Sequence, residues 1–130
     1  MKKFILAITL CSSLVLAFTA TAADKKLPPA STQKGVTFAK DIKPIFEKTC
    51  FECHGDKKQK GKLRLDSLEN ALKASENGKS IVPGKSADSS LVKSVARLVE
   101  DDAMPPEGKS RPLTAAEVGL IRAWIDQGAK

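Results

Sequence analysis

Hydrophobic residues recur at helical spacing in several stretches of the chain after residue 35. The first stretch places Phe38, Ile42 and Phe46 on one face, at steps of four residues. Pro44 would break the interior of such a helix. With Asp41 as the N-cap, however, Pro44 falls in the first turn, where its missing N–H has no intrahelical partner to lose. The pattern therefore predicts a helix that ends close to residue 50.

Two further helices are expected in the middle of the chain. A short one should begin at Ser67 and stop before the Asn77-Gly78 pair. An amphipathic one should cover residues 91–99, introduced by the serine-rich segment 86–90. Between these helices the chain is rich in glycine and lysine, which is typical of loops.

The last helix has the clearest signals. Thr114 and Glu117 have the spacing of a capping box, and Gly128 is a natural C-terminal stop. Apolar residues form a stripe between these ends: Val118, Ile121, Trp124 and Ile125. No alternating apolar run is long enough to indicate a sheet, so we predict the all-α class.

The N-terminal segment has the layout of a secretory signal peptide. Lys2 and Lys3 precede an apolar stretch, and Ala20 and Ala22 form an A-x-A site. We therefore predict a signal peptide over residues 1–22 and an extracytoplasmic location, such as the periplasm. A retained membrane anchor is the alternative, and only then is membrane contact expected; polar residues interrupt the stretch and disfavour it.

Cleavage after residue 22 leaves 108 of the 130 residues and lowers the formal charge from +7 to +5. Residues 23–35 are rich in Pro, Ser and Lys and show no apolar periodicity, which predicts a flexible tether. Residues 36–130 then form one small domain.

Composition is that of an ordinary soluble globular protein, with 42% hydrophobic and 28% charged residues. Aromatic residues make up only 5%, with no Tyr and one Trp. A domain of this size with so few large side chains is short of core material, so we expect something else to fill its centre.

The most informative residues are Cys50-Phe51-Glu52-Cys53-His54, a C-x-x-C-H pentapeptide. This is the attachment motif of c-type haem. Two thiols about one helical turn apart can each add to one of the two vinyl groups of haem. The adjacent imidazole can then bind the iron as the proximal ligand. We therefore predict one covalent haem c as the cofactor.

Three other interpretations of the two cysteines are weaker. A thioredoxin-type redox pair should follow a strand and open a helix, whereas here a helix is expected before Cys50. A structural zinc site needs four ligands, and no second Cys/His pair exists outside the signal segment. A disulfide between Cys50 and Cys53 would close too small a loop to stabilise the fold much.

The second axial ligand can be sought by elimination. His54 is the only histidine, and Met104 is the only methionine after the initiator. A thioether is a soft donor suited to ferrous iron, and the prolines after Met104 restrict the loop that presents it. We predict His54 and Met104 as the metal ligands; a packing role for Met104 and ligation by a lysine remain the alternatives.

The sequence resembles the c-type cytochromes, and specifically the short planctomycete-type cytochrome c modules. The resemblance covers nearly the whole chain from Phe38. Besides the motif, its main stretches are residues 38–45, 61–67, 81–84, 90–91, 104–106 and 113–129. Lys62 stands where such modules often have a second glycine. The resemblance implies a small helical fold wrapped around one haem, with the first and last helices crossing at Phe46 and Trp124.

The expected function is one-electron transfer by a single-haem cytochrome with His/Met ligation, not an enzymatic reaction. A coordinately saturated iron favours electron exchange over catalysis, and a methionine ligand raises the reduction potential. The alternative is a haem-based sensor or a docking module of a larger oxidoreductase. A haem peroxidase would need a distal base, and no second histidine exists.

Two further features concern the surroundings of the haem. Pro83 lies in a Pro-Gly turn whose backbone carbonyl could accept a hydrogen bond from the Nδ1–H of the proximal histidine, although an ordinary turn is an equal alternative. A basic run follows the motif: Lys57, Lys58, Lys60, Lys62 and Arg64. This run could steer an acidic redox partner toward the haem, or simply be a solvated loop. The protein is expected to be a monomer. Nucleic-acid binding is not expected.

Overall fold

The structure is a computed structural model that describes residues 26–130. Helices make up most of its regular structure, which confirms the helical prediction in outline. The elements follow one another as η1 (Phe38–Ile42), α1 (Lys43–Thr49), α2 (Phe51–His54), η2 (Lys60–Lys62), α3 (Leu68–Ala71), β1 (Ala74–Ser75), β2 (Gly78–Lys79), η3 (Ser86–Asp88), α4 (Ser90–Val95) and α5 (Ala115–Asp126).

The predicted signal peptide, residues 1–22, lies outside the described residues. Within residues 26–130, no helix combines the length and apolar character that a membrane crossing requires.

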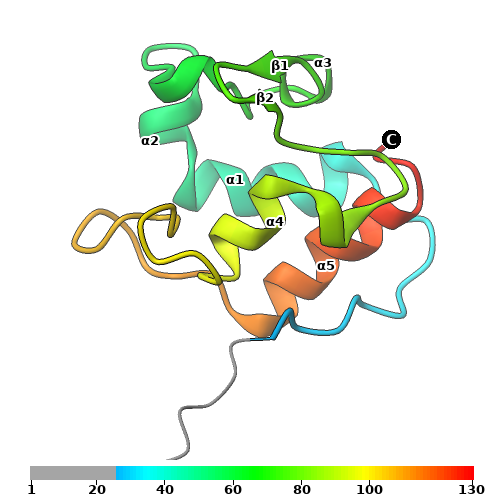
Figure 1. Cartoon of the computed structure of the whole chain (residues 1–130). Coiled ribbons are helices and arrows are strands. Elements are labelled where there is room, and N and C mark those ends of the chain that lie inside the picture. Colours follow the sequence, from blue (N-terminus) through cyan, green and yellow to red (C-terminus); the bar gives the residue numbers. More distant parts are fainter. Residues whose placement is uncertain (1–25) are drawn as a thin grey trace, which may run out of the picture.

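Figure 1 shows α1, α4 and α5 in the lower part of the molecule, with α3 and the β1–β2 hairpin above them. The motif-bearing α2 lies at the left of this view, above the long loop that follows α4. The Phe51 side chain of α2 is partly buried and packs against the hydrophobic core.

The first helix begins earlier than the sequence predicted. Residues 38–42 form a wide π-type turn, η1, that leads into α1, and Thr37 is the N-cap. The prediction that Asp41 is the N-cap is wrong: its carboxylate accepts a hydrogen bond from the Thr37 N–H at 2.8 Å. Pro44 is the second residue of α1, where its missing N–H is tolerated as expected.

A two-stranded antiparallel sheet, β1–β2, corrects the all-α prediction. Ala74 pairs with Lys79 and Ser75 with Gly78. Each strand has two residues, too few to show an alternating pattern. The signal that could have revealed the hairpin is Asn77-Gly78, because this pair is typical of tight hairpin turns.

Helix α4 ends before Val99, the predicted limit. Its last residue is Val95, and Arg97 adopts a left-handed backbone conformation with φ of 56°. Residues other than glycine are strained in this conformation, so a glycine is the usual sequence signal for it. Because an arginine stands here instead, the sequence pattern gives no sign that the helix ends. The chain turns at Arg97 into the long loop, residues 98–114.

Helix α5 forms as the sequence predicted. The Thr114 hydroxyl accepts from the Glu117 N–H at 3.2 Å, and the Glu117 carboxylate accepts from the Thr114 N–H at 2.8 Å. These two bonds complete the capping box. Gly128 follows the helix with φ of 103°, the left-handed conformation that suits a C-terminal glycine.

The core joins the first helical segment of the described chain to the last helix. Phe46 and Trp124 are fully buried, and both rings pack on Phe38, with centroids 6.2 and 5.8 Å away. The predicted meeting of Phe46 and Trp124 is thus mediated by a third ring. The indole N–H of Trp124 and the Phe38 N–H both donate to the backbone oxygen of Lys130 at 2.9 Å.

Residues 27–35 form an N-terminal strap along α5 rather than the free tether predicted for 23–35. The Ser31 N–H donates to Gly119 O at 2.9 Å, and the Gln127 side chain donates to Gln33 O at 2.8 Å. Gly119 has no side chain, so the strap backbone can lie directly against the helix. Tertiary contact orders a segment whose composition alone is typical of a linker.

Candidate functional site

The turn between α1 and α2 presents the two cysteines and the histidine together. The Cys50 N–H donates to Phe46 O at 2.7 Å, which closes the last turn of α1. Cys50 O then accepts from Cys53 N at 3.1 Å and His54 N at 2.9 Å. One carbonyl therefore fixes the backbone of all three motif residues within a single helical turn.

The His54 side chain is half-buried and incompletely satisfied. Its Nδ1 is the one buried side-chain nitrogen or oxygen without a hydrogen-bond partner in the part of the chain that the structure describes. Burial lowers the pKa of His54, and the backbone of Leu63 and Lys60 opposes this shift without completing a bond to Nδ1. A neutral imidazole is the form that can bind a metal ion.

The two motif cysteines are free thiols, and the fold does not activate that of Cys50. Burial raises the pKa of the Cys50 thiol, and a 3.3 Å contact with the Thr49 hydroxyl only partly opposes that shift. A redox-active pair of the thioredoxin type instead has a lowered thiol pKa. The strands of the described chain all follow the motif, which also differs from the thioredoxin arrangement.

The zinc alternative finds no second set of ligands. Within residues 26–130, His, Cys, Asp and Glu side chains form no group of three or more that could hold a metal ion.

Met104 lies in the long loop after α4 and is tied back to that helix. Its N–H donates to Ser94 O at 3.0 Å. The Arg97 guanidinium donates to Pro105 O, also at 3.0 Å. The side chain of Met104 is half-buried and packs against the hydrophobic core. Two bonds therefore hold the backbone on either side of its thioether.

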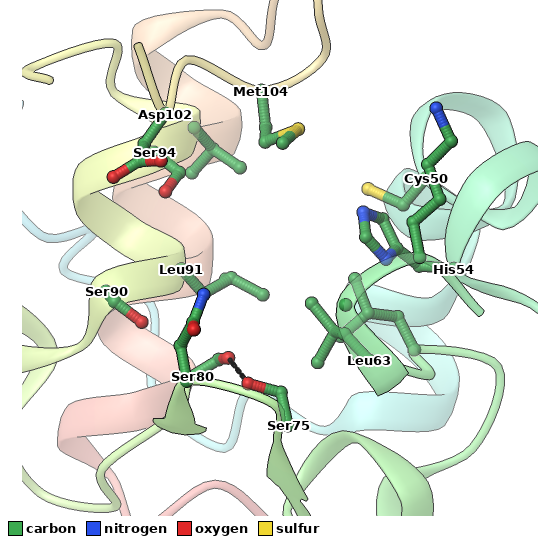
Figure 2. Close-up of a pocket in the computed structure, with 15 residues that line it drawn as sticks. Cys50, His54, Leu63, Ser75, Ser80, Ser90, Leu91, Ser94, Asp102 and Met104 are labelled. Atoms are coloured by element: carbon green, nitrogen blue, oxygen red, sulfur yellow. Dashed lines mark hydrogen bonds between the residues drawn. The ribbon is translucent and has the colours of Figure 1, made fainter. Parts of the chain in front are cut away.

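The fold brings Met104 to the motif although it lies fifty residues beyond His54. Cys50, His54 and Met104 line one cavity of about 320 Å³. Figure 2 shows Met104 above this cavity, Cys50 and His54 on one side, and Leu63 and Leu91 reaching toward its middle. An adjoining cavity of about 220 Å³ is also lined by Cys50, His54 and Met104, and in addition by Cys53.

The end of the cavity away from Met104 is polar. Ser75 and Ser80 lie there with their hydroxyl oxygens 3.3 Å apart, and Ser90 lines the wall beside them (Figure 2). Ser80 is buried, and the Ser75 hydroxyl donates to Gly78 O at 2.8 Å. The serines bring hydroxyl donors and acceptors to this end of the cavity. Sequence analysis missed them because they come from separate segments.

Pro83 is the one predicted site residue that the structure leaves apart. It is exposed and lines neither cavity. Its turn instead faces α5, since the Gly84 N–H donates to Ile125 O at 2.7 Å. The His54 ring instead has the backbone of Lys60 and Leu63 beside it.

The basic run surrounds the base of the motif. Lys57, Lys58, Lys60 and Lys62 are exposed, and none of them forms an ion pair within the described residues. Arg64 differs, because its guanidinium pairs with the Asp66 carboxylate. Lys60 lines both cavities. Lys60 therefore brings one unpaired positive charge to the cavities, and the other three lysines lie within eight residues of His54 along the chain.

The residues present fit a c-type haem. The cavities offer two thiols, a neutral imidazole and a thioether, which are donors that haem iron and haem vinyl groups accept. Their volumes match those of small-molecule sites, roughly 300–1,000 Å³ in total. The orphaned Nδ1 of His54 does not weaken the fit, because the other ring nitrogen of a buried histidine can serve as the ligand.

Comparison with solved structures gives a likeness to Kuenenia stuttgartiensis hydrazine synthase. The TM-score is 0.51 and the sequence identity is 23%, over 72% of this chain and 16% of that chain. The present chain thus spans a small part of that larger protein, and the likeness concerns the fold alone. No curated protein gives a significant match.

Comparison with protein families gives a more specific result. Residues 50–108 match the model of the Planctomycete cytochrome C family. The match begins at Cys50 and includes Cys53, His54 and Met104. Members of a cytochrome c family carry haem c, so the match supports a haem c protein. The resemblance of this chain to the planctomycete cytochrome c family is therefore confirmed over the stretch that holds the C-x-x-C-H motif and the methionine.

Proposed function

We propose that the protein is a single-haem c-type cytochrome that carries one electron at a time. Cys50 and Cys53 would attach the haem, and His54 and Met104 would be the axial ligands. The observation that carries the proposal is the convergence of these residues on adjoining cavities, from segments fifty residues apart.

Attachment requires no external oxidant or reductant. Each thiol adds across one vinyl C=C bond: the S–H bond breaks, an S–C bond forms and the proton ends on the neighbouring carbon. The short turn that joins Cys50 to Cys53 keeps the two sulfurs on one side of the cavities. Burial of Cys50 keeps its thiol protonated until the cofactor arrives.

His54 and Met104 would hold the iron from two sides. When bound, the haem exchanges one electron between ferric and ferrous iron. The backbone of His54 is held in place by a hydrogen bond, because its carbonyl accepts from the Leu65 N–H at 2.8 Å. Met104 is held by the two bonds of its loop. Little movement of either side chain is needed during electron exchange, which favours a carrier over an enzyme.

The serine-lined end of the cavity suits the two carboxylates of haem. Hydroxyl groups donate hydrogen bonds to carboxylate oxygens. Ser75 and Ser80 lie at the opposite end from Met104, beneath Leu63 and Leu91 (Figure 2). The apolar residues would cover the ring, and the polar end would take its charged groups.

We further propose that the protein works as a monomer outside the cytoplasm and exchanges electrons with acidic partners. The predicted signal peptide supports the location, and haem attachment through a C-x-x-C-H motif is consistent with it. The unpaired lysines that follow the motif, of which Lys60 lines both cavities, support electrostatic steering.

The first experiment measures covalent attachment. The full chain is produced with a cytochrome c maturation system, and its intact mass and haem-peroxidase staining are recorded. We expect one covalently attached haem in the wild type and none in the double variant Cys50→Ser with Cys53→Ser. A wild type without haem mass would refute the proposal.

The second experiment tests the axial ligand. Met104→Ala leaves both cysteines and His54 intact, so its haem should stay attached. Loss of the thioether should lower the reduction potential and allow carbon monoxide to bind the reduced protein. Spectroelectrochemical titration of both proteins measures the difference. Identical potentials and identical carbon monoxide binding would assign Met104 to packing. Avid binding by the wild type would favour a gas sensor.

A further inference from the structure

Arg97 occupies a backbone position that disfavours its own side chain. Its φ of 56° lies in the left-handed region, which glycine adopts most readily. Helix α4 ends at Val95, and the left-handed turn at Arg97, two residues later, redirects the chain into the loop that carries Met104. A glycine at this position would make the same turn without strain, so the arginine side chain needs a separate explanation.

The Arg97 side chain makes one bond, and that bond holds the methionine loop. Its Nη1 donates to Pro105 O at 3.0 Å. Pro105 is buried directly after Met104, so the guanidinium reaches the first carbonyl beyond the methionine. A charged donor makes a stronger hydrogen bond than a neutral one. The bond therefore fixes the loop at the point where the thioether is presented.

The backbone couples Arg97 to Met104 a second time. Ser94 O accepts two hydrogen bonds at 3.0 Å, one from the Arg97 N–H and one from the Met104 N–H. The left-handed turn and the methionine are thus anchored on the same carbonyl. A change of the backbone or side chain at Arg97 should therefore shift the chain on both sides of Met104.

From these contacts we infer that Arg97 is a positioning residue for Met104: it holds the thioether over the cavity and so determines how readily the sixth coordination position opens. The inference rests on the proposed ligation of iron by Met104. It extends that proposal to a residue that lines neither cavity.

Arg97→Gly is the most direct test, because it removes the side-chain bond and also relieves the backbone strain. The haem should remain covalently attached. The unfolding temperature should change little, because the relieved backbone strain offsets the lost hydrogen bond. The affinity of the reduced protein for carbon monoxide should rise about tenfold, the effect of losing one hydrogen bond from a charged donor. The near-infrared methionine-to-iron(III) charge-transfer band should be lost at a lower temperature.

Lys93→Gln is the matched control. Lys93 lies on α4, four residues before Arg97; it lines neither cavity and forms no ion pair within the described residues. This variant removes the same charge but leaves the loop bond intact, so both readouts should equal those of the wild type. An equal response in Lys93→Gln and Arg97→Gly would assign the effect to charge and overturn the inference.

Met104→Ala, measured in the same series, separates the two proposals. If Met104→Ala differs from the wild type and Arg97→Gly does not, the positioning role of Arg97 is refuted while iron ligation by Met104 stands. If Met104→Ala matches the wild type, the ligation itself fails, and the role of Arg97 fails with it.

Discussion

Protonation of Glu117 should destabilise the N-terminus of α5 in acid. The Arg111 guanidinium, together with the N–H and hydroxyl of Thr114, lowers the pKa of Glu117 from 4.5 to about 2. The folded protein therefore holds fewer protons than the unfolded chain between these values. Its extra stability is complete above about pH 4.5 and is lost as the pH falls toward 2.

The structure sets the size of this effect. At about 1.36 kcal/mol per pH unit, the full lowering of the pKa corresponds to about 3 kcal/mol. The side chain of Arg111 is 52% exposed and that of Glu117 is 21% exposed, so solvent weakens their attraction. We therefore expect Glu117→Gln to destabilise the protein by about 1–2 kcal/mol at pH 7 and by almost nothing at pH 2.

The assay is urea unfolding of the haem-loaded protein from pH 2 to 7, followed by circular dichroism. Other acid-sensitive groups act alike in both proteins, so only the difference between wild type and Glu117→Gln is interpreted. Glu69→Gln is the control, because Glu69 pairs with Lys73 on an exposed surface and should contribute less. A difference that stays constant from pH 7 to pH 2 would contradict the reasoning.

Three further predictions concern the surface, the strap and the polar end of the cavity. Charge reversal by Lys57→Glu with Lys58→Glu should slow electron transfer to an acidic partner at low salt and flatten its salt dependence, measured by stopped flow; an unchanged rate would leave the lysines a solvated loop. Gly119→Ala places a Cβ 2.7 Å from the Pro29 carbonyl oxygen, so the strap should detach and limited proteolysis there should accelerate; unchanged cleavage would contradict this packing. Ser80→Val should raise the apparent pKa of a haem carboxylate, seen as a shifted pH dependence of the reduction potential, whereas an unaltered profile would place the carboxylates elsewhere.

Local motifs could be predicted because all their atoms lie within one turn of chain. The spacing of Cys50, Cys53 and His54 follows from the chemistry of haem attachment, whatever surrounds them. The capping box of Thr114 and Glu117 is likewise complete within four residues, and the structure forms it as expected. The class of protein and the best-formed helix were therefore readable from the sequence.

The assembly of the site depended on contacts between distant segments. Elimination named Met104 as the ligand candidate, but only folding places it over the same cavity as His54. The same folding turns the Pro83 loop toward α5 and brings Ser90 of α4 to the cavity that Ser75 and Ser80 also line. No local pattern encodes such distances, because they arise from how the helices pack.

Packing also overruled two local patterns. The strap, residues 27–35, has the composition of a linker, yet Gly119 leaves a gap on α5 that the strap backbone occupies. Residues 91–99 continue an apolar helical pattern, yet the turn at Arg97 ends the helix and sends the chain toward Met104. The sequence by itself determined which chemistry this protein can hold; the tertiary structure decided where each donor lies, because hydrogen bonds and close packing between remote segments outweigh weak local preferences.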